Sequence, residues 1–317
     1  MSGNSFIVTH SLGRRLWKNT VFRFVLFVSC VTYYVGYSTR SYPHSVVEPA
    51  AVFNGKEATS FREKSELEFY SQKGADEWAY ATLNRYWQSM KEREEYTPFY
   101  VDLTANHPYE ISNTAFFDDI GWAGVCIDGS PKYIQMLKSS NRTCKVVHAV
   151  IDACADDIVE WVEKGSGSGI VSPHMDNKNS SGRVRAKTTT LDMVLQVLDA
   201  PRVIDYFSLD VEGAEYSVLK TFPFTQYAFR AITIERPPPW LNELLFGAGY
   251  VWIKNSEDGF DSFYVHKNLS MVNTLPHTEF VQVPQKCDGL PGTSCPWLEK
   301  PVDVNCKGSV LVSPVPD

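Results

Sequence analysis

The chain has 317 residues, of which 44% are hydrophobic and 13% aromatic, a composition typical of a packed globular protein with room for one large domain and added segments. A formal net charge of -7 provides no basic field for a phosphate backbone, which argues against nucleic-acid binding as the main task. The charge is uneven, because no Asp or Glu occurs before Glu48.

The N-terminus carries an apolar run, 24–37, after a group of basic residues that includes Arg14, Lys18 and Arg23. Extended back to residue 21, the run reaches the roughly 17 residues that a helix needs to cross a bilayer. Positive charge precedes the run and little follows it, which predicts a cytosolic basic tail over 1–20 and a signal-anchor transmembrane helix over 21–37. The rest of the chain would then lie in the lumen of the endoplasmic reticulum or Golgi. A cleaved signal peptide or an Arg-rich transit peptide has the same acid-poor start, so both remain alternatives.

Cysteines and glycosylation sequons agree with a lumenal location. Six cysteines lie beyond Cys30, an even number that permits disulfides without fixing their connectivity. Cys126 falls within a predicted buried strand, where we expect a free thiol. Acceptor sequons begin at Asn141, Asn179 and Asn268.

Segment 38–67 is polar, contains prolines and shows no sustained periodicity, which predicts a stem or linker. From 76 to 94 apolar residues recur at helical spacing, so a helix is expected to pack on the domain. We expect the folded domain to span 68–267. An irregular segment containing Cys and Pro would follow over 268–317.

Short apolar runs then alternate with helical stretches, a rhythm that predicts a doubly wound α/β domain. A final pair of runs is separated only by a turn, as in an antiparallel hairpin. The expected fold is a mostly parallel, seven-stranded sheet, and the Gly-rich and polar interval 155–187 is expected to be a mobile loop. The predicted strands are 99–103, 124–128, 145–151, 204–210, 231–235, 249–254 and 262–266.

The most informative stretch is 204–215, where a strand runs directly into a helix. Asp210, Glu212 and Glu215 lie at this junction, and the carboxyl end of such a strand usually opens into a ligand crevice. Alternatively, Glu212 and Glu215 only favour a helix N-terminus, where the helix dipole stabilises negative charge.

An acidic residue ends or follows each of the first five predicted strands. A carboxylate at the end of the second strand, Asp128, is placed to accept hydrogen bonds from the ribose of a cofactor. The sequence has no glycine-rich phosphate loop and no Gly-x-Ser-x-Gly elbow, which favours a nucleoside cofactor without phosphates over a dinucleotide or a serine hydrolase. The five residues are Asp102, Asp128, Asp152, Asp210 and Glu235.

These motifs resemble the FkbM-type methyltransferases of the class I, Rossmann-like fold that uses S-adenosyl-L-methionine. The resemblance rests on segments 100–106, 112–114, 121–128, 190–192, 205–215 and 232–235, of which Ser-Leu-Asp-Val-Glu-Gly-Ala-Glu is the most specific. It implies that Asp102, Ala105 and Asn106 line the cofactor, that Asp128 holds its ribose and that Asp152 lies near its adenine. Asp210 and Glu212 would face the methyl group and the acceptor. Thr104 and Pro108 depart from the family, which often has Gly at these positions.

The resemblance implies O-methylation of a sugar or small-molecule hydroxyl in the secretory pathway. Such an acceptor must lose its proton, and Asp210, Glu212 or Glu235 could remove it, with His107 as a further candidate. No spacing of residues predicts a metal site. The chain is also similar to Star-type membrane proteins of growth-factor trafficking, so a catalytically weak or inactive trafficking protein is the alternative.

Overall fold

The computed structural model describes residues 46–47, 51–55, 68–91, 96–173, 175–268 and 306. The predicted basic tail and transmembrane helix lie outside these residues, as do Cys287 and Cys295. Among the helices that can be described, none is both long and apolar enough to cross a membrane.

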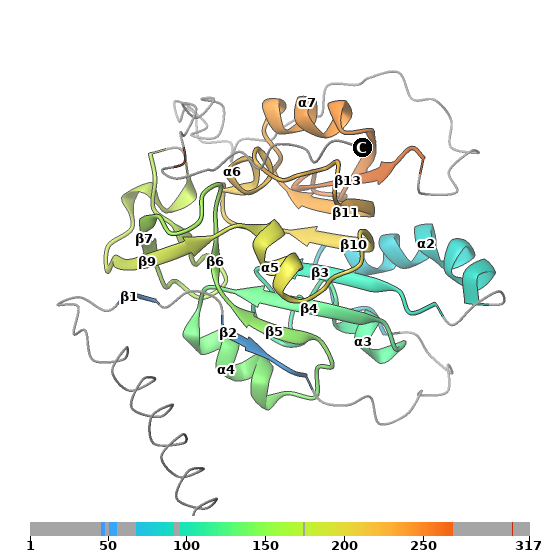
Figure 1. Ribbon diagram of the computed structural model, residues 1–317, viewed down its shortest axis with the longest axis horizontal. Coiled ribbons are helices and arrows are strands. Elements are labelled where there is room, and N and C mark those ends of the chain that lie inside the picture. Colours follow the sequence, from blue (N-terminus) through green and yellow to red (C-terminus); the bar gives the residue numbers. More distant parts are fainter. Residues whose placement is uncertain are drawn as a thin grey trace, which may run out of the picture. The chain divides into compact units, whose positions relative to one another are not determined.

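The domain is built around an eight-stranded sheet (Figure 1). The central strands β11, β10, β3, β4 and β5 are parallel neighbours in this order, and β13, β12 and β2 pair antiparallel at the two sides. In chain order the strands are β2 (Ala51–Phe53), β3 (Phe99–Leu103), β4 (Ala123–Asp128), β5 (Lys145–His148), β10 (Val203–Leu209), β11 (Ala228–Glu235), β12 (Tyr250–Asn255) and β13 (Asp261–His266).

The prediction of an α/β fold with alternating strands and helices is confirmed, but the predicted number of seven strands is wrong, because the large sheet is a mixed one of eight strands. The additional strand, β2, comes from the segment expected to be a linker and pairs antiparallel with β5. A strand of three residues is too short to show a period, so its pairing at the sheet edge could not be read from the sequence.

A second, smaller sheet replaces the mobile loop expected over 155–187. Its strands are β1 (Val46–Val47), β6 (Val150–Ile151), β7 (Ile158–Val162), β8 (Gly169–Ile170) and β9 (Val184–Thr189), and the 3₁₀-helix η1 (Asp176–Asn179) lies between β8 and β9. The predicted strand 145–151 is divided, because β5 joins the large sheet and β6 joins the small one. Trp161 and Ile170 of this insertion are buried in the main core, which fixes the segment despite its glycines.

Helices cover both faces of the large sheet (Figure 1). On one face, α2 (Ala75–Lys91), α3 (Ala115–Asp119) and α4 (Pro131–Ser139) bury Leu83, Phe117 and Leu137 against the strands. On the other, the core is closed by α5 (Leu191–Val197), α6 (Glu215–Leu219) and α7 (Pro239–Gly247). The helix expected over 76–94 is thus confirmed as α2.

The described residues form two disulfides, Cys126–Cys144 and Cys154–Cys306. The expectation that Cys126 is a free thiol is therefore wrong. Cys144 immediately precedes β5, which is the parallel neighbour of β4, so the two sulfur atoms meet between adjacent strands. Sequence spacing could not show this, because it does not give the strand order.

Candidate functional site at the carboxyl edge of the sheet

The carboxyl ends of β3, β4, β10 and β11 bring the predicted carboxylates to one edge of the sheet. Asp102 lies near the end of β3, Asp128 ends β4, Asp210 follows β10 and Glu235 ends β11. Because these four strands are parallel neighbours, their carboxyl ends share one edge.

The loop after β3 is clamped to β4. The backbone N–H of Ala105 donates to Ile127 O at 3.0 Å, and that of Asn106 donates to Asp128 Oδ2 at 2.9 Å. Thr104 and Asn106 have φ angles of 59° and 52°, in the left-handed region that glycine adopts most readily. The loop after β3 therefore has a backbone conformation typical of glycine, although position 104 carries a β-branched threonine.

Asp128 is 2% exposed, and its two carboxylate oxygens accept hydrogen bonds from the backbone of Asn106 and of Ser130, the latter at 2.7 Å. Burial raises the pKa of Asp128 to about 6, and the two backbone N–H groups oppose this rise by stabilising the carboxylate. Asp128 thus joins the loops after β3 and β4.

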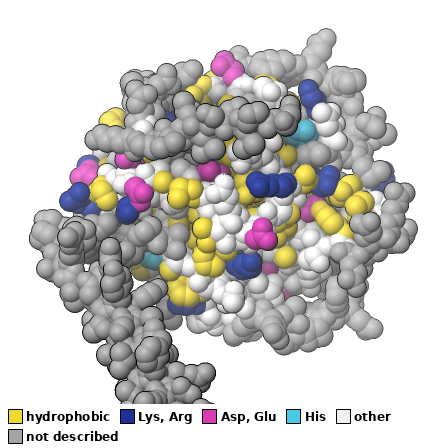
Figure 2. Space-filling view, viewed as in Figure 1, with side chains coloured by type: hydrophobic (Ala, Val, Ile, Leu, Met, Phe, Trp, Pro, Cys, Tyr) yellow, Lys and Arg dark blue, Asp and Glu magenta, His cyan; other side chains and the backbone are white. Residues whose placement is uncertain are grey.

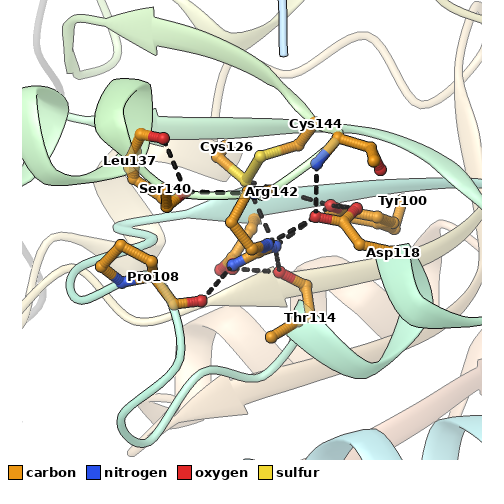
Figure 3. The surroundings of a disulfide bond; sticks show 12 residues. Tyr100, Pro108, Thr114, Asp118, Cys126, Leu137, Ser140, Arg142 and Cys144 are labelled. Carbon is orange, nitrogen blue, oxygen red and sulfur yellow. Dashed lines mark hydrogen bonds and ion pairs between the residues drawn. A yellow bond between two sulfur atoms is a disulfide. The ribbon is translucent and has the colours of Figure 1, made fainter. Parts of the chain in front are cut away.

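Asp102 points to the face of the sheet that is covered by α3. Thr114 Oγ1 donates to Asp102 Oδ2 at 2.5 Å, and burial raises the pKa of Asp102 to about 6. Thr114 Oγ1 in turn accepts from Arg142, whose guanidinium also bonds Asp118 and lies beside the Cys126–Cys144 disulfide (Figure 3). This buried network was missed in the sequence, where Arg142 is only the middle residue of a sequon. A fully buried arginine is rare and has no local sequence signal.

Asp152 follows β6 and is tied to α6, since Ser217 Oγ donates to Asp152 Oδ1 at 2.5 Å. His107 caps a turn, because its Nδ1 accepts from the backbone N–H of Glu110 at 2.9 Å. This bond assigns a structural role to His107.

The space between these loops, which we call the crevice, has a cavity volume of about 30 Å³. Its walls include Leu103, Thr104, Gly129, Ile151, Trp161 and Ile170. A volume of this size corresponds to about one water molecule, whereas pockets for small organic ligands measure roughly 300–1,000 Å³. In this conformation, the crevice does not fit S-adenosyl-L-methionine.

The small sheet closes the crevice. Trp161 of β7 lies so close to Gly129 that a Cβ on this glycine would be 3.3 Å from the indole Nε1. Trp161 and Ile170 are 4% and 6% exposed, so both fill space at the position next to Asp128 where a ribose and adenine are expected. Sequence reasoning missed this closure, because it took the whole interval to be a mobile loop.

The acidic cluster consists of Asp210, Glu212, Glu215 and Glu235. Burial and the neighbouring Glu235 raise the pKa of Glu212 to about 8 and that of Glu215 to about 7, and the same causes raise the pKa of Asp210 well above its usual range. Oxygens of Asp210, Glu215 and Glu235 lie within 4.8 Å of one another, a distance at which like charges repel strongly in a buried site. At least part of the cluster is therefore protonated near neutral pH.

The members of the cluster differ in their contacts. Glu215 Oε1 accepts from the backbone N–H groups of Val211 and Gly213, both at 3.1 Å, and so holds the junction between β10 and α6. This contact supports a structural role for Glu215. Glu212 has a φ of 55°, in the left-handed region that residues with a side chain rarely adopt. Unlike the carboxylate of Glu215, that of Glu212 lies near the guanidinium of Arg236.

Arg236 forms ion pairs with two members of the acidic cluster, Glu212 and Glu235. One of its guanidinium nitrogens lies 2.5 Å from Asp176, 2.6 Å from Glu235 and 3.5 Å from Glu212. Oxygens of these three carboxylates also lie within 4.8 Å of one another, but the arginine provides the positive charge that a metal ion would bring. Arg236 and Asp176 were not predicted, because Asp176 belongs to the insertion, whose position depends on the tertiary fold.

Comparison with known proteins identifies the domain that carries this edge. No curated protein and no solved structure matches the chain. Residues 102–255 match the family model described as the methyltransferase FkbM domain. The segment that bears Asp102, Asp128, Asp210 and Glu235 is therefore the one that matches a methyltransferase FkbM domain.

Proposed function

We propose that this protein is a methyltransferase that uses S-adenosyl-L-methionine and methylates a hydroxyl group of a sugar or small molecule. The family match over 102–255 supports methyl transfer, and the acidic cluster supports an oxygen acceptor. A hydroxyl acceptor must lose its proton, and a carboxylate with a pKa near the working pH removes it effectively. The proposal rests on Glu212 as the general base, because its pKa is raised to about 8. Asp210 and Glu235 are its neighbours.

The proposal requires the crevice to widen. Ala105, Asn106 and Asp128 are arranged around the loops where the resemblance places the cofactor, but Trp161 and Ile170 close the space beside them. We therefore propose that β7 and β8 withdraw when the cofactor binds.

Calorimetric titration of the purified full chain with S-adenosyl-L-methionine tests this function. Binding together with transfer of labelled methyl to a hydroxyl acceptor supports it, and the rate should rise with pH as the acidic cluster loses its protons. Glu212→Gln should lower the rate by roughly 10²- to 10⁴-fold, the usual contribution of a general base. Equal rates for this variant and the parent would refute the role of Glu212.

The closed crevice favours a second candidate, a catalytically inactive Star-like protein of cargo trafficking. The cavity of about 30 Å³ beside Gly129 supports this candidate because it is much smaller than a nucleoside. Absence of both heat and thermal stabilisation at millimolar S-adenosyl-L-methionine would favour it over the enzyme.

The proposed location is the lumen of the endoplasmic reticulum or Golgi, with a membrane anchor over 21–37. Two disulfides support an oxidising compartment, and Asn141, Asn179 and Asn268 are exposed as glycan acceptors must be. Release of the protein from membranes by carbonate, with no mobility shift after glycosidase digestion, would overturn this proposal.

Nucleic acid is not among the proposed partners. On the face shown in Figure 2, Lys and Arg side chains are interspersed with Asp and Glu among the described residues. The net charge of -7 agrees with this distribution, since a nucleic-acid site needs a continuous basic surface.

A further inference from the structure

A larger cavity, of about 620 Å³, lies between the N-terminal half of α2 and the β12–β13 hairpin. We call it the α2 groove, and its walls include Lys73, Glu77, Trp78, Lys254, Asp258 and Phe263. The volume falls within the range of roughly 300–1,000 Å³ that small ligands occupy. The α2 groove can therefore hold a ligand that the crevice cannot.

Phe263 of the α2 groove and Glu235 of the acidic cluster lie on one face of the sheet. Phe263 and Asp261 are two residues apart on β13, so their side chains point to the same side. Asp261 is paired directly with Glu235 on β11, and directly opposite residues also share a face. Phe263 in the wall of the α2 groove and Glu235, one of the carboxylates proposed to remove a proton, therefore lie on the same side of the sheet.

The hairpin turn joins the two regions. Lys73, in the wall of the α2 groove, lies over the ring of Phe260 at 5.3 Å, and Arg236 of the acidic side approaches the same ring at 5.9 Å. The backbone N–H of Arg236 also donates to Phe260 O at 2.8 Å. Phe260 therefore contacts both Lys73 in the wall of the α2 groove and Arg236 on the acidic side.

The lining of the α2 groove indicates the class of ligand. Trp78 stacks on the buried ring of Phe263 with a centroid distance of 4.8 Å, which holds the indole in place as a flat apolar surface. Around it lie charges of both signs, and two of them, Lys73 and Asp258, neutralise each other in an ion pair. An aromatic surface with mixed donors and acceptors and no dominant charge fits a neutral ligand rich in hydroxyl groups. The C–H face of a pyranose ring packs on an indole, while its hydroxyls bond carboxylates and ammonium groups.

We propose that the α2 groove binds a neutral pyranose on Trp78 and presents one of its hydroxyls toward Glu235 and Asp210. This inference rests on the proposed function and specifies its acceptor as a sugar. The binding step itself does not depend on the cofactor, because the α2 groove and the crevice share no lining residue.

Saturation-transfer NMR on the full chain, without cofactor, tests the proposal with the methyl pyranosides of glucose, galactose and mannose. At least one should bind, and Trp78→Ala should weaken it roughly tenfold, whereas Trp78→Phe should retain most of the affinity because a ring remains. Trp240→Ala is the matched control, since Trp240 is a partly exposed tryptophan on α7 and does not line the α2 groove.

The outcomes separate this inference from the proposed function. Pyranoside binding that depends on Trp78, in a protein that does not bind S-adenosyl-L-methionine, would refute the enzyme and leave the sugar site standing. Cofactor binding without pyranoside binding would refute the sugar site alone. Equal affinity in the parent and Trp78→Ala, or binding of inorganic phosphate or a diamine in place of the pyranosides, would also refute it.

Discussion

The indole of Trp161 lies against Gly129, at a distance of 3.3 Å from the position that a Cβ on this glycine would occupy. Gly129 directly follows Asp128, the carboxylate proposed to hold a ribose. Under the proposed function, Trp161 therefore occupies space that the nucleoside of the cofactor would need, and its displacement on binding distinguishes the proposed enzyme from the inactive alternative.

Trp161→Leu is expected to enlarge the crevice and to tighten the binding of S-adenosyl-L-methionine about tenfold, corresponding to about 1.4 kcal/mol. The gain arises because the parent must first displace the indole from its buried position. Trp122→Leu is the control, since Trp122 is buried on the opposite face against Phe117, at a ring distance of 4.4 Å. Calorimetry measures both variants, and unchanged affinity in Trp161→Leu would mean that the indole does not obstruct the cofactor.

Thr104→Gly is expected to stabilise the loop after β3. A left-handed conformation costs a residue with a Cβ about 1–2 kcal/mol, and the flexibility of glycine in the unfolded chain offsets about 0.5–1 kcal/mol of this gain. The free energy of unfolding should rise by up to about 1 kcal/mol in urea denaturation, and cofactor affinity should also increase. Thr104→Ala keeps the Cβ and should show neither gain. Equal stability and equal cofactor affinity of Thr104→Gly and Thr104→Ala would contradict an effect of the left-handed φ of 59° at Thr104.

The free energy of unfolding should fall as the pH rises from about 4.5 to 8. Burial raises the pKa of Asp102 to about 6, of Glu215 to about 7 and of Glu212 to about 8, from ordinary values of 3.8 and 4.5. The folded state therefore holds more protons than the unfolded state in this range, so its stability is complete below the ordinary values and is lost as the pH passes the raised ones.

Urea denaturation at pH 5.5 and at pH 8.5 measures this loss. Glu212→Gln, which cannot ionise, should show a smaller difference between the two pH values. A urea midpoint that increases from pH 5.5 to pH 8.5 would show that folding does not raise the pKa values of these carboxylates.

Arg142→Met should lower the free energy of unfolding by about 3–5 kcal/mol, because it leaves the Asp118 carboxylate buried without its partner. Arg142 Nε lies 2.5 Å from Asp118 Oδ2, and both side chains are almost completely buried. Arg202→Met is the control, since Arg202 is exposed and should change stability by less than about 1 kcal/mol. Similar losses in both variants would argue against a special role for the buried pair.

The sequence by itself determined the alternation of strands and helices in the large sheet and the acidic residues at the carboxyl ends of β3, β4, β10 and β11. The alternation of apolar runs with helical segments is a local property, so β3, β4, β10, β11 and α2 could be predicted from it. The carboxyl ends of parallel strands meet at one edge, and this geometric rule predicts that Asp102, Asp128, Asp210 and Glu235 lie at the same edge of the sheet.

Only the tertiary structure decided what surrounds these carboxylates. Trp161 closes the crevice and Arg236 pairs with Asp176 through contacts between segments far apart in the chain, which no local pattern encodes. The Cys126–Cys144 disulfide likewise follows from β4 and β5 being neighbours. The sequence specifies which chemical groups reach the edge of the sheet, whereas long-range packing sets their charge, their partners and the space left for a ligand.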